Sequence, residues 1–550
     1  MNRFLSICIL LGVLLANTAQ AQFQYAIGTE VYDAGRSIQY TPADPGYIIA
    51  GRTDRQVFGL SEATLVKRGI NGGLAWDAVY GQAKSDIFNS VRDIPATANL
   101  KAGYAALGSS QSFGLGGDDV YFVRTDAAGI PVFSYIYGRA KDDRGNCLQY
   151  IKDPTVGTGY GYVLAGETSS FPQFPGVNIY IIKTDEFGAL VRSTVIGGDG
   201  DGTAYWIEQT RDLGYIVAGT TTSKTCGGGT PNQDIFVIKL DINLVIQWNA
   251  IIGGGPSRPY PDIAYSVVES PLDGSFTVAG ITRSYGVNFN GDSFLLNLSP
   301  GGGLNWFKTY GWERTEQANS VHFAINPVTN APEYIVGGQS NSYTSGTEDA
   351  YLFKTDISGN LLWTYIYGSQ GREVIAEVTD SGDRGYVFTG EVEAGWTRKN
   401  DIYFVKTDYD GKSGTDCEIR VDQKEIRFDI CYNKSAQQVF VQDNKSITTP
   451  YKFTEYHQFR CDASTVGLAL PDTNTEVLLA LNEQSKLTVT FDKEVQNATI
   501  KVFNTGGNLV TQSTVTGKTG DVQLGSAPAG LYVIHIVYND GTIIRKKIIK

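Results

Sequence analysis

The chain repeats one pattern of apolar and polar positions seven times. Its clearest copy begins with GYIVAGTTTS at Gly214, continues with DIFVIKLD at Asp234 and ends with QWNAIIGGG at Gln247. Short runs of β-branched and aromatic residues bounded by Gly, Asp and Asn are typical of β-strands joined by turns. No segment between these runs keeps a helical period. The pattern therefore predicts a repeated, all-β unit.

The spacing of the repeats predicts how the units assemble. The last glycine of the first phrase recurs at Gly51, Gly108, Gly166, Gly219, Gly280, Gly338 and Gly390. This period is slightly longer than the roughly 40–50 residues of repeats that form propeller blades. Each copy holds four strand-like runs, and four antiparallel strands make one blade. We therefore expect a seven-bladed β-propeller.

The two ends of the repeat region complement each other. The seventh copy has its third strand at Asp401 but lacks the aromatic-to-glycine strand that follows in the other copies. The segment FQYAIG at Phe23–Gly28 matches that strand in type, as in WTYIYG at Trp363. We expect Phe23–Gly28 to complete the seventh blade, because closure removes an exposed sheet edge. Tryptophans that recur at one repeat position are expected to pack between blades.

Composition and pattern divide the chain into four regions. We expect a signal peptide over 1–21, the propeller over 22–413, a small all-β connector over 414–475 and a C-terminal β-sandwich over 476–550. The connector is more charged than the repeats and lacks their glycine phrase.

The N-terminus has the features of an export signal. Arg3 supplies the positive charge, Phe4 to Leu15 the apolar core, and a small-x-small site predicts cleavage between Ala21 and Gln22. No other apolar run is long enough to cross a bilayer.

Charge and residue counts argue against several kinds of site. The formal charge is −12, whereas nucleic-acid binding needs clustered Lys and Arg. Of the three histidines (His322, His457 and His535), one lies in the propeller, which argues against a histidine metal site or a Ser/His/Asp site there. The glycine-rich loop at 197–202 lacks the further acids of a calcium loop, so calcium is only weakly indicated and no cofactor is expected.

Five cysteines remain after cleavage of the signal. Cys417, Cys431 and Cys461 cluster after the propeller. We expect one disulfide between two of these three, and the spacing leaves the pairing open.

The last 70 or so residues carry a recognisable set of motifs. These are FNTGGNLV at 503–510, an L-x-x-x-P-A-G-x-Y-x-x-x-I run from Leu524 to Ile536, and a closing KKIIK at 546–550. The segment resembles the C-terminal (type A-like) sorting domain of type IX secretion cargo in Bacteroidetes. The Pro-Asn-Pro phrase that commonly opens such domains is absent before Lys486, which leaves the start of the domain undefined.

The resemblance implies a route and a partner. Such cargo crosses the inner membrane by its signal peptide and the outer membrane by the type IX secretion machinery, to be released or attached to the cell surface. The residues that match the sorting signal are Gly530, Tyr532, Lys546, Lys547 and Lys550.

Two functions stay open from the sequence. The first is a non-enzymatic scaffold that binds a glycan or a protein through loops between blades, such as 109–119 and 283–292. The alternative is an extracellular polysaccharide hydrolase, which needs two carboxylates about 5–9 Å apart. The available acids are Glu167, Glu208, Glu269, Asp262 and Glu377. Nothing in the sequence selects a pair, and no catalytic residue is assigned.

Overall fold

The structure is a computed structural model in which every regular element of the described residues is a β-strand. It describes residues 22–550 except 29–30, 55–59, 172–175, 198–199, 223–231, 255–257, 287–289, 344–346, 369–370, 395–398, 415–417, 422, 428–429, 436–438, 442–449, 452–456, 460–476, 482–485, 505–508, 525–530, 539–542 and 550. Within this part of the chain, no helix is long and apolar enough to cross a membrane.

Residues 23–407 form seven small antiparallel sheets. Sheet 1 holds β2 (Asp33–Thr41), β3 (Gly46–Asp54), β4 (Ser61–Gly69) and β5 (Leu74–Tyr80). Sheet 2 holds β6 (Asp86–Ile94), β7 (Gly103–Ser110), β8 (Asp119–Asp126) and β9 (Pro131–Tyr137). Sheet 3 holds β10 (Asp143–Lys152), β11 (Tyr160–Thr168), β12 (Asn178–Asp185) and β13 (Leu190–Ile196). Sheet 4 holds β14 (Gly202–Gln209), β15 (Tyr215–Thr221), β16 (Asp234–Leu240) and β17 (Ile246–Gly253).

The remaining three sheets follow the same order. Sheet 5 holds β18 (Asp262–Glu269), β19 (Phe276–Thr282), β20 (Asp292–Leu298) and β21 (Leu304–Gly311). Sheet 6 holds β22 (Glu316–Ile325), β23 (Pro332–Ser340), β24 (Asp349–Asp356) and β25 (Leu361–Tyr367). Sheet 7 holds β26 (Glu373–Asp380), β27 (Tyr386–Ala394), β28 (Lys399–Thr407) and, from the other end of the chain, β1 (Phe23–Gly28).

The N-terminal strand is the fourth strand of sheet 7. It pairs antiparallel with β28, with Phe23 opposite Lys406 and Ile27 opposite Ile402. Gln24 Nε2 also donates to Ser413 Oγ at 2.7 Å, which ties this strand to the chain beyond β28.

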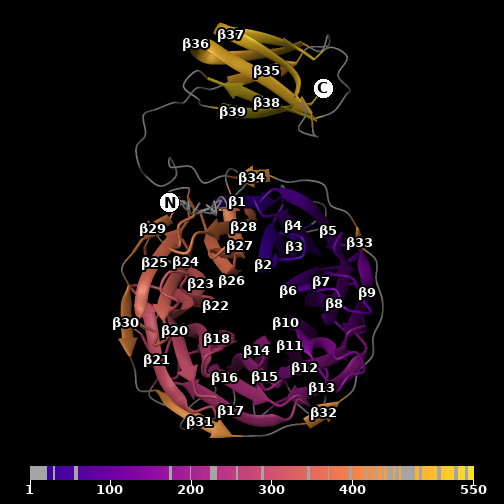
Figure 1. Ribbon diagram of the computed structural model, residues 1–550, viewed down its shortest axis with the longest axis vertical. Helices are drawn as coiled ribbons and strands as arrows, with labels where there is room; N and C mark the ends of the chain where they lie inside the picture. Colours follow the sequence, from indigo (N-terminus) through magenta and orange to yellow (C-terminus); the bar gives the residue numbers. More distant parts are fainter. Residues whose placement is uncertain are drawn as a thin grey trace, which may run out of the picture. The chain divides into compact units, whose positions relative to one another are not determined.

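The seven sheets stand around a ring, with their first strands innermost (Figure 1). Each first strand contacts that of the next sheet, and β26 of sheet 7 contacts β2 of sheet 1. Side chains join successive first strands. Ser37 Oγ accepts a hydrogen bond from Val91 N at 3.0 Å, and Glu377 Oε2 accepts one from Ile38 N at 3.1 Å. The latter bond joins the last sheet to the first.

The repeated tryptophans pack between neighbouring sheets, as the sequence predicted. Trp76 of sheet 1 donates from Nε1 to Ala127 O at 3.0 Å in the turn between β8 and β9. The turn glycine Gly129 has φ 78°, and a Cβ on it would lie 2.7 Å from the Trp76 ring. Only glycine suits both that conformation and that contact. The same arrangement joins Gly302 to Trp248, Gly359 to Trp306 and Gly411 to Trp363.

Six short strands after the ring run along its outer edge, and we call residues 418–459 the belt. They are β29 (Glu418–Arg420), β30 (Lys424–Arg427), β31 (Cys431–Ser435), β32 (Val439–Val441), β33 (Pro450–Tyr451) and β34 (His457–Phe459). They pair antiparallel with β25, β21, β17, β13, β5 and β1, in that order. The belt therefore follows the ring backwards and adds a fifth strand to six sheets (Figure 1).

The sequence analysis expected a small all-β connector over 414–475, and the described elements of this region are the β-strands of the belt. Its strands are two to five residues long. Segments this short do not make a stable sheet by themselves, whereas an open sheet edge offers them backbone partners. The described strands of this region accordingly pair with the ring. The compact unit that contains the ring extends to Leu468.

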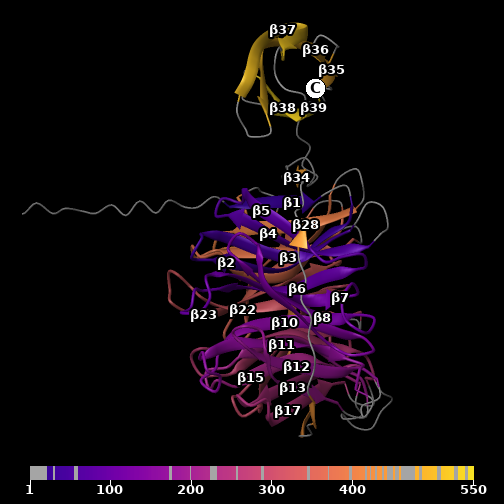
Figure 2. The same cartoon turned by 90° about the vertical axis from the view of Figure 1, so that its right-hand side faces the viewer.

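The C-terminal unit, Ala469–Lys550, is one sheet with its own core. Its strands are β35 (Val477–Leu481), β36 (Lys486–Asn504), β37 (Leu509–Gln523), β38 (Leu531–Val537) and β39 (Ile543–Ile549). The order is β35-β36-β38-β39, and β37 pairs with β36. The pairing of β36 with β37 is irregular between Thr490 and Ala498. These two long strands are curved (Figure 2).

Candidate functional site

Each first strand of the ring carries one β-bulge at the same place. In sheet 1, the pairing of β2 with β3 shifts between Gly35 and Ser37, so Arg36 is the extra residue. A bulge turns a side chain away from the regular alternation of the strand. The seven extra residues, which we call the bulge ring, are Arg36, Asn89, Asn146, Tyr205, Tyr265, Asn319 and Ala376.

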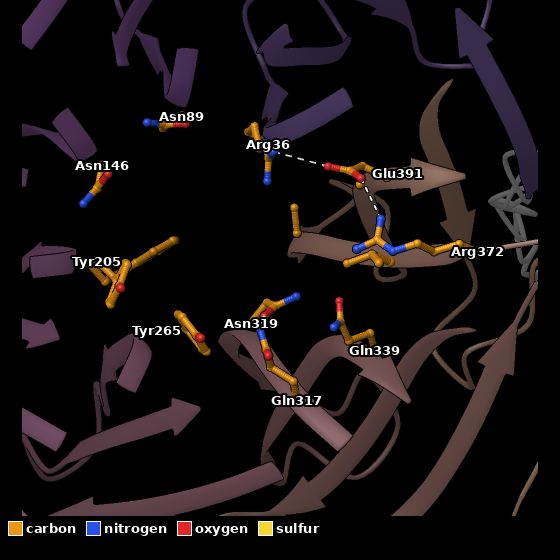
Figure 3. A pocket seen from close by; sticks show the side chains of 14 residues that line it. Arg36, Asn89, Asn146, Tyr205, Tyr265, Gln317, Asn319, Gln339, Arg372 and Glu391 are labelled. Carbon is orange, nitrogen blue, oxygen red and sulfur yellow. Dashed lines mark hydrogen bonds and ion pairs between the residues drawn. The ribbon is translucent and has the colours of Figure 1, made fainter. Parts of the chain in front are cut away.

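All seven residues of the bulge ring line one cavity of about 480 Å³ (Figure 3). The other lining residues are Trp206, Gln317, Gln339, Arg372, Val374, Gly390 and Glu391. This volume lies within the roughly 300–1,000 Å³ of small-molecule sites. The cavity is therefore built from strands of all seven sheets rather than from the loops that the sequence suggested.

The asparagines of the bulge ring are held by neighbouring sheets. Asn89 Nδ2 donates to Gly145 O at 2.9 Å, and Asn146 Nδ2 donates to Ala204 O at 2.9 Å. Asn319 Nδ2 donates to Ile375 O at 2.7 Å. Only the NH₂ end of an amide can donate to a carbonyl oxygen, so these bonds turn the NH₂ end of each side chain toward the next sheet.

Tyr205 and Tyr265 form an aromatic pair on one wall. Their ring centroids are 5.1 Å apart at 58°. Burial raises the pKa of both hydroxyls, to about 12 for Tyr265, and nearby charge on Glu167 adds to the rise for Tyr205. Both side chains are therefore neutral phenols near pH 7, each able to donate and accept a hydrogen bond.

A charged network forms the opposite wall (Figure 3). Glu391 lies 3.3 Å from Arg36 Nη2 and 2.7 Å from Arg372 Nη1. Tyr32 OH donates to it at 2.6 Å. Burial alone would raise the pKa of Glu391, but these partners outweigh it and hold the pKa below its usual value. Arg372 Nε also lies 2.5 Å from Glu348, so each guanidinium has a carboxylate partner.

A buried ion pair supports the wall next to Trp206. Arg92 Nη1 lies 3.4 Å from Glu377 Oε1, and both side chains are buried. The guanidinium also lies over the Trp206 ring, 5.3 Å from its centroid. The Arg92 side chain is therefore fixed by charge and by an aromatic face at once.

The five acids named from the sequence lie outside the cavity lining. Four of them hold structural partners. Glu167 lies 2.9 Å from Arg144, Glu269 lies 3.3 Å from Arg211, and Glu377 binds Arg92. Asp262 accepts from Thr282 Oγ1 at 2.6 Å.

Glu208 is the fifth of these acids. Burial, followed by repulsion from Glu269, raises its pKa to about 8.

Buried carboxyl groups face each other where neighbouring sheets meet. Asp119 Oδ1 and Asp143 Oδ2 lie 2.2 and 2.8 Å from the point that a Cβ on Gly138 would occupy. Burial is the main cause that raises the pKa of Asp119 to about 7, and Asp143 adds repulsion. Equivalent pairs are Asp234 with Asp262, Asp292 with Glu316, Asp349 with Glu373, and Asp401 with Asp33. The sequence analysis missed these pairs.

The structure places some of the other residues singled out from the sequence. Tyr532 is buried in β38, and Lys546 and Lys547 lie in β39. Ala21, Gly530 and Lys550 lie outside the described residues, and Gln22 begins them. The export cleavage site and the roles of the sorting residues therefore stay predictions.

The expected disulfide also stays a prediction. Cys431 opens β31 opposite Gly253, whereas Cys417 and Cys461 lie outside the described residues. Cys147, in the ring, is buried and unpaired. Within the described part of the chain, no group of three or more His, Cys, Asp or Glu could hold a metal ion.

The bulge ring left a signal that the sequence analysis did not use. In four copies the extra residue directly precedes a serine, as in Arg36-Ser37 and Tyr265-Ser266. Its identity varies between copies while its surroundings repeat. A variable position inside a repeated strand therefore marks this site better than the variable loops do.

The family of secretion system C-terminal sorting domains matches residues 483–550. No curated protein matches the chain. Among solved structures, Sqt1 from Chaetomium thermophilum is 13% identical, with 68% of this chain and 83% of that chain covered and a TM-score of 0.39.

Two bacterial structures are also similar to this chain. The extracellular domain of a putative one component system from B. thetaiotaomicron is 9% identical, with 93% and 74% covered and a TM-score of 0.23. PorZ, a surface component of the type-IX secretion system of Porphyromonas gingivalis, is 12% identical, with 96% and 99% covered and a TM-score of 0.21. The chain carries, at residues 483–550, a secretion system C-terminal sorting domain.

Proposed function

We propose that this protein is an exported, non-enzymatic binding protein whose ring holds a small polar ligand in the cavity of the bulge ring. In this proposal the seven sheets are the blades of a closed β-propeller, and type IX secretion delivers it to the cell surface or the medium. The sorting domain carries the export part of the proposal. The bulge ring supports the binding part, because each of the seven sheets contributes one bulge side chain to one cavity, and these are one Arg, three Asn, two Tyr and one Ala.

Three observations support the propeller. Each of sheets 1 to 6 holds four consecutive strands, and β1 completes sheet 7. A hydrogen bond from Ile38 N of β2 to Glu377 of β26 joins sheet 1 to sheet 7. The hydrolase alternative gains less support, because four of the five candidate acids are engaged by Arg144, Arg92, Arg211 and Thr282. The C-terminal sheet, with its curved long strands around one core, fits a β-sandwich.

Removal of residues 483–550 tests the export part. The truncated protein should accumulate in the periplasm, with its ring folded, while the full chain reaches the surface or the medium. Fractionation and immunoblotting distinguish the two. Normal amounts of truncated protein outside the cell would refute this part of the proposal.

A blocked cavity tests the binding part. Ala376→Trp should fill the cavity from one bulge. We expect at least one member of a panel of mono- and disaccharides, amino acids and dipeptides to raise the melting temperature of the full protein but not of this variant. Tyr260→Ala, at an exposed position outside the cavity, is the matched control. Equal shifts in both variants would place the ligand elsewhere.

A further inference from the structure

We infer that the ligand of the cavity is a short, neutral saccharide. The inference rests on the proposed function of the cavity and adds the chemical class of its ligand. Three properties of the walls carry it: balanced charge, fixed hydrogen-bonding groups and an aromatic face.

The charges of the cavity are already paired. Arg36 and Arg372 both contact Glu391, and Arg372 also contacts Glu348. Two guanidinium groups thus face two carboxylates. An ionic ligand would compete with these internal partners and leave one charge without compensation, which is costly away from water. The network therefore favours a ligand without net charge.

The polar groups of the walls suit hydroxyl groups. The amides of Asn89 and Asn146 are held by their NH₂ ends, which leaves each carbonyl oxygen as an acceptor. Arg36 has five N–H donors, and its side chain is 41% exposed although Nη2 contacts Glu391. A hydroxyl both donates and accepts, so it can bond to either kind of group. Because the amides are fixed beforehand, binding loses little side-chain entropy.

The aromatic wall suits the C–H face of a sugar ring. Tyr205 and Tyr265 present apolar ring surface together with neutral hydroxyls. Apart from these two residues, the apolar side chains of the lining are Trp206, Val374 and Ala376. An apolar ligand would make no hydrogen bond to the amide oxygens of Asn89 and Asn146 or to the N–H donors of Arg36 that Glu391 does not use, which is unfavourable. A molecule with one apolar face and a polar edge fits both walls.

Calorimetry on the full exported chain tests this inference. Cellobiose, lactose and maltose are the neutral probes, and glucuronic acid and N-acetylneuraminic acid are the charged ones. We expect at least one neutral probe to bind, at least tenfold more tightly than both charged probes. Tyr265→Ala should weaken that binding at least tenfold. Tyr265→Phe, which keeps the ring, should weaken it less, and Tyr260→Ala should leave it unchanged.

The possible failures separate the two proposals. Tighter binding of a charged sugar that Ala376→Trp abolishes would overturn the neutral class and leave the cavity as the binding site. Binding of a neutral saccharide that persists in both Ala376→Trp and Tyr265→Ala would show that the cavity is not the binding site. If no saccharide binds but an amino acid or dipeptide binds in the cavity, the saccharide inference fails and the proposed function stands. Circular dichroism and thermal unfolding of each variant exclude loss of the fold as the cause.

Discussion

Asp119 and Asp143 show how single residues can make the ring sensitive to pH. Both carboxyl groups are buried, and Asp119 Oδ1 has no hydrogen-bond partner among the described residues. Burial raises the pKa of Asp143 too, although Asp143 accepts hydrogen bonds from Ser170 Oγ at 2.7 Å and from Arg139 N at 2.8 Å, which favour its ionised form. Burial is the main cause that raises the pKa of Asp119, and repulsion from Asp143 adds to it, so Asp119 keeps its proton to higher pH. Asn178, which occupies the equivalent position in sheet 3, carries no charge at all.

We expect the ring to lose stability as the pH rises from about 4 to 7. The pKa of Asp119 is raised from 3.8 to about 7 in the folded chain, so the folded state binds the extra proton over this range. The stabilisation that protonated Asp119 contributes is complete below the pKa of this group in the unfolded chain. It is lost as the pH rises through its pKa in the folded chain. The slope is at most about 1.4 kcal/mol per pH unit for each such group. Asp119→Asn mimics the protonated acid, so its melting temperature relative to that of the parent should rise from pH 5 to pH 8. A pH-independent difference would contradict the raised pKa of Asp119.

Substitution of Gly129 tests the contact between the turn after β8 and the ring of Trp76. Gly129→Ala brings a Cβ to 2.7 Å from Trp76 and strains a φ of 78°. The strain alone costs about 1–2 kcal/mol, and the clash should add to it. Gly159 is the matched control, because its φ is 75° and nothing lies within 4 Å of its Cβ position. Urea unfolding should show the larger loss for Gly129→Ala, and equal losses would mean that the Trp76 contact contributes nothing.

At the scale of elements, the repeated strands could be predicted from the sequence, whereas the bulges within them could not. The phrases at Gly214 and Asp234 predicted strands, and β15 and β16 lie there. The partner of Phe23–Gly28 could be predicted because one copy lacked a strand of that type. The bulge at Arg36 could not, because a bulge depends on the register between two strands, which residue types alone do not set.

The belt escaped sequence analysis for a related reason. Its strands alternate like those of any small sheet, and their partners lie up to several hundred residues away, as for Phe459 and Ala26. Which edge such a segment covers depends on the closed shape of the ring. Pairing with an existing edge leaves no periodic signal of its own. The sequence therefore predicted strands in this region but not the sheets with which they pair.

The belt should stabilise the ring, and two truncations separate it from the sorting domain. Lys308 is buried and lies 2.6 Å from Glu425 of β30. A chain ending at Ser413 loses this partner and uncovers six sheet edges, so it should melt several degrees lower and aggregate more readily. A chain ending at Leu468 keeps the belt, and its ring should unfold like that of the full protein. Scanning calorimetry compares the two, and equal melting temperatures would show that the belt is dispensable.

At the scale of the whole ring unit, the last strand of the belt pairs with the sheet in which the two ends of the ring meet. β1 lies between β28 on one side and β34 on the other. The N-terminal strand is thus paired along both edges, although it is covalently joined to neither neighbour. The belt itself begins on sheet 6 and ends on sheet 7, and these sheets are adjacent, since β22 contacts β26. One gap between adjacent sheets therefore separates its two ends.

In the sequence, one cysteine lies just before the first strand of the belt and another just after its last strand. Cys417 directly precedes Glu418, the first residue of β29, and Cys461 follows Phe459, the last of β34, by two residues. Cys431 lies in β31, on sheet 4. A disulfide needs Cα atoms within about 7 Å, whereas β31 on sheet 4 is two sheets away from β29 on sheet 6 and three from β34 on sheet 7. We predict that Cys417 pairs with Cys461.

The reach of the chain supports this pairing. Between Arg420 of β29 and Lys424 of β30, four residue steps cross from sheet 6 to sheet 5. Four steps span at most roughly 14 Å. From Phe459 to Glu418, three steps and a disulfide of about 5.5–6 Å between Cα atoms span roughly 16 Å. The bond can therefore bridge one more gap of the same kind, and it would close the belt into a covalent hoop.

Peptide mapping under non-reducing conditions tests the hoop on the exported chain. We expect one linked pair of peptides, containing Cys417 and Cys461, with Cys147, Cys226 and Cys431 free. Cys461→Ser should lower the free energy of unfolding by about 2–4 kcal/mol, as for loops of this kind, and Cys431→Ser should not. Because both cysteines precede Ala469, the bond should persist after the C-terminal unit is removed. A linked pair that contains Cys431 would contradict this prediction.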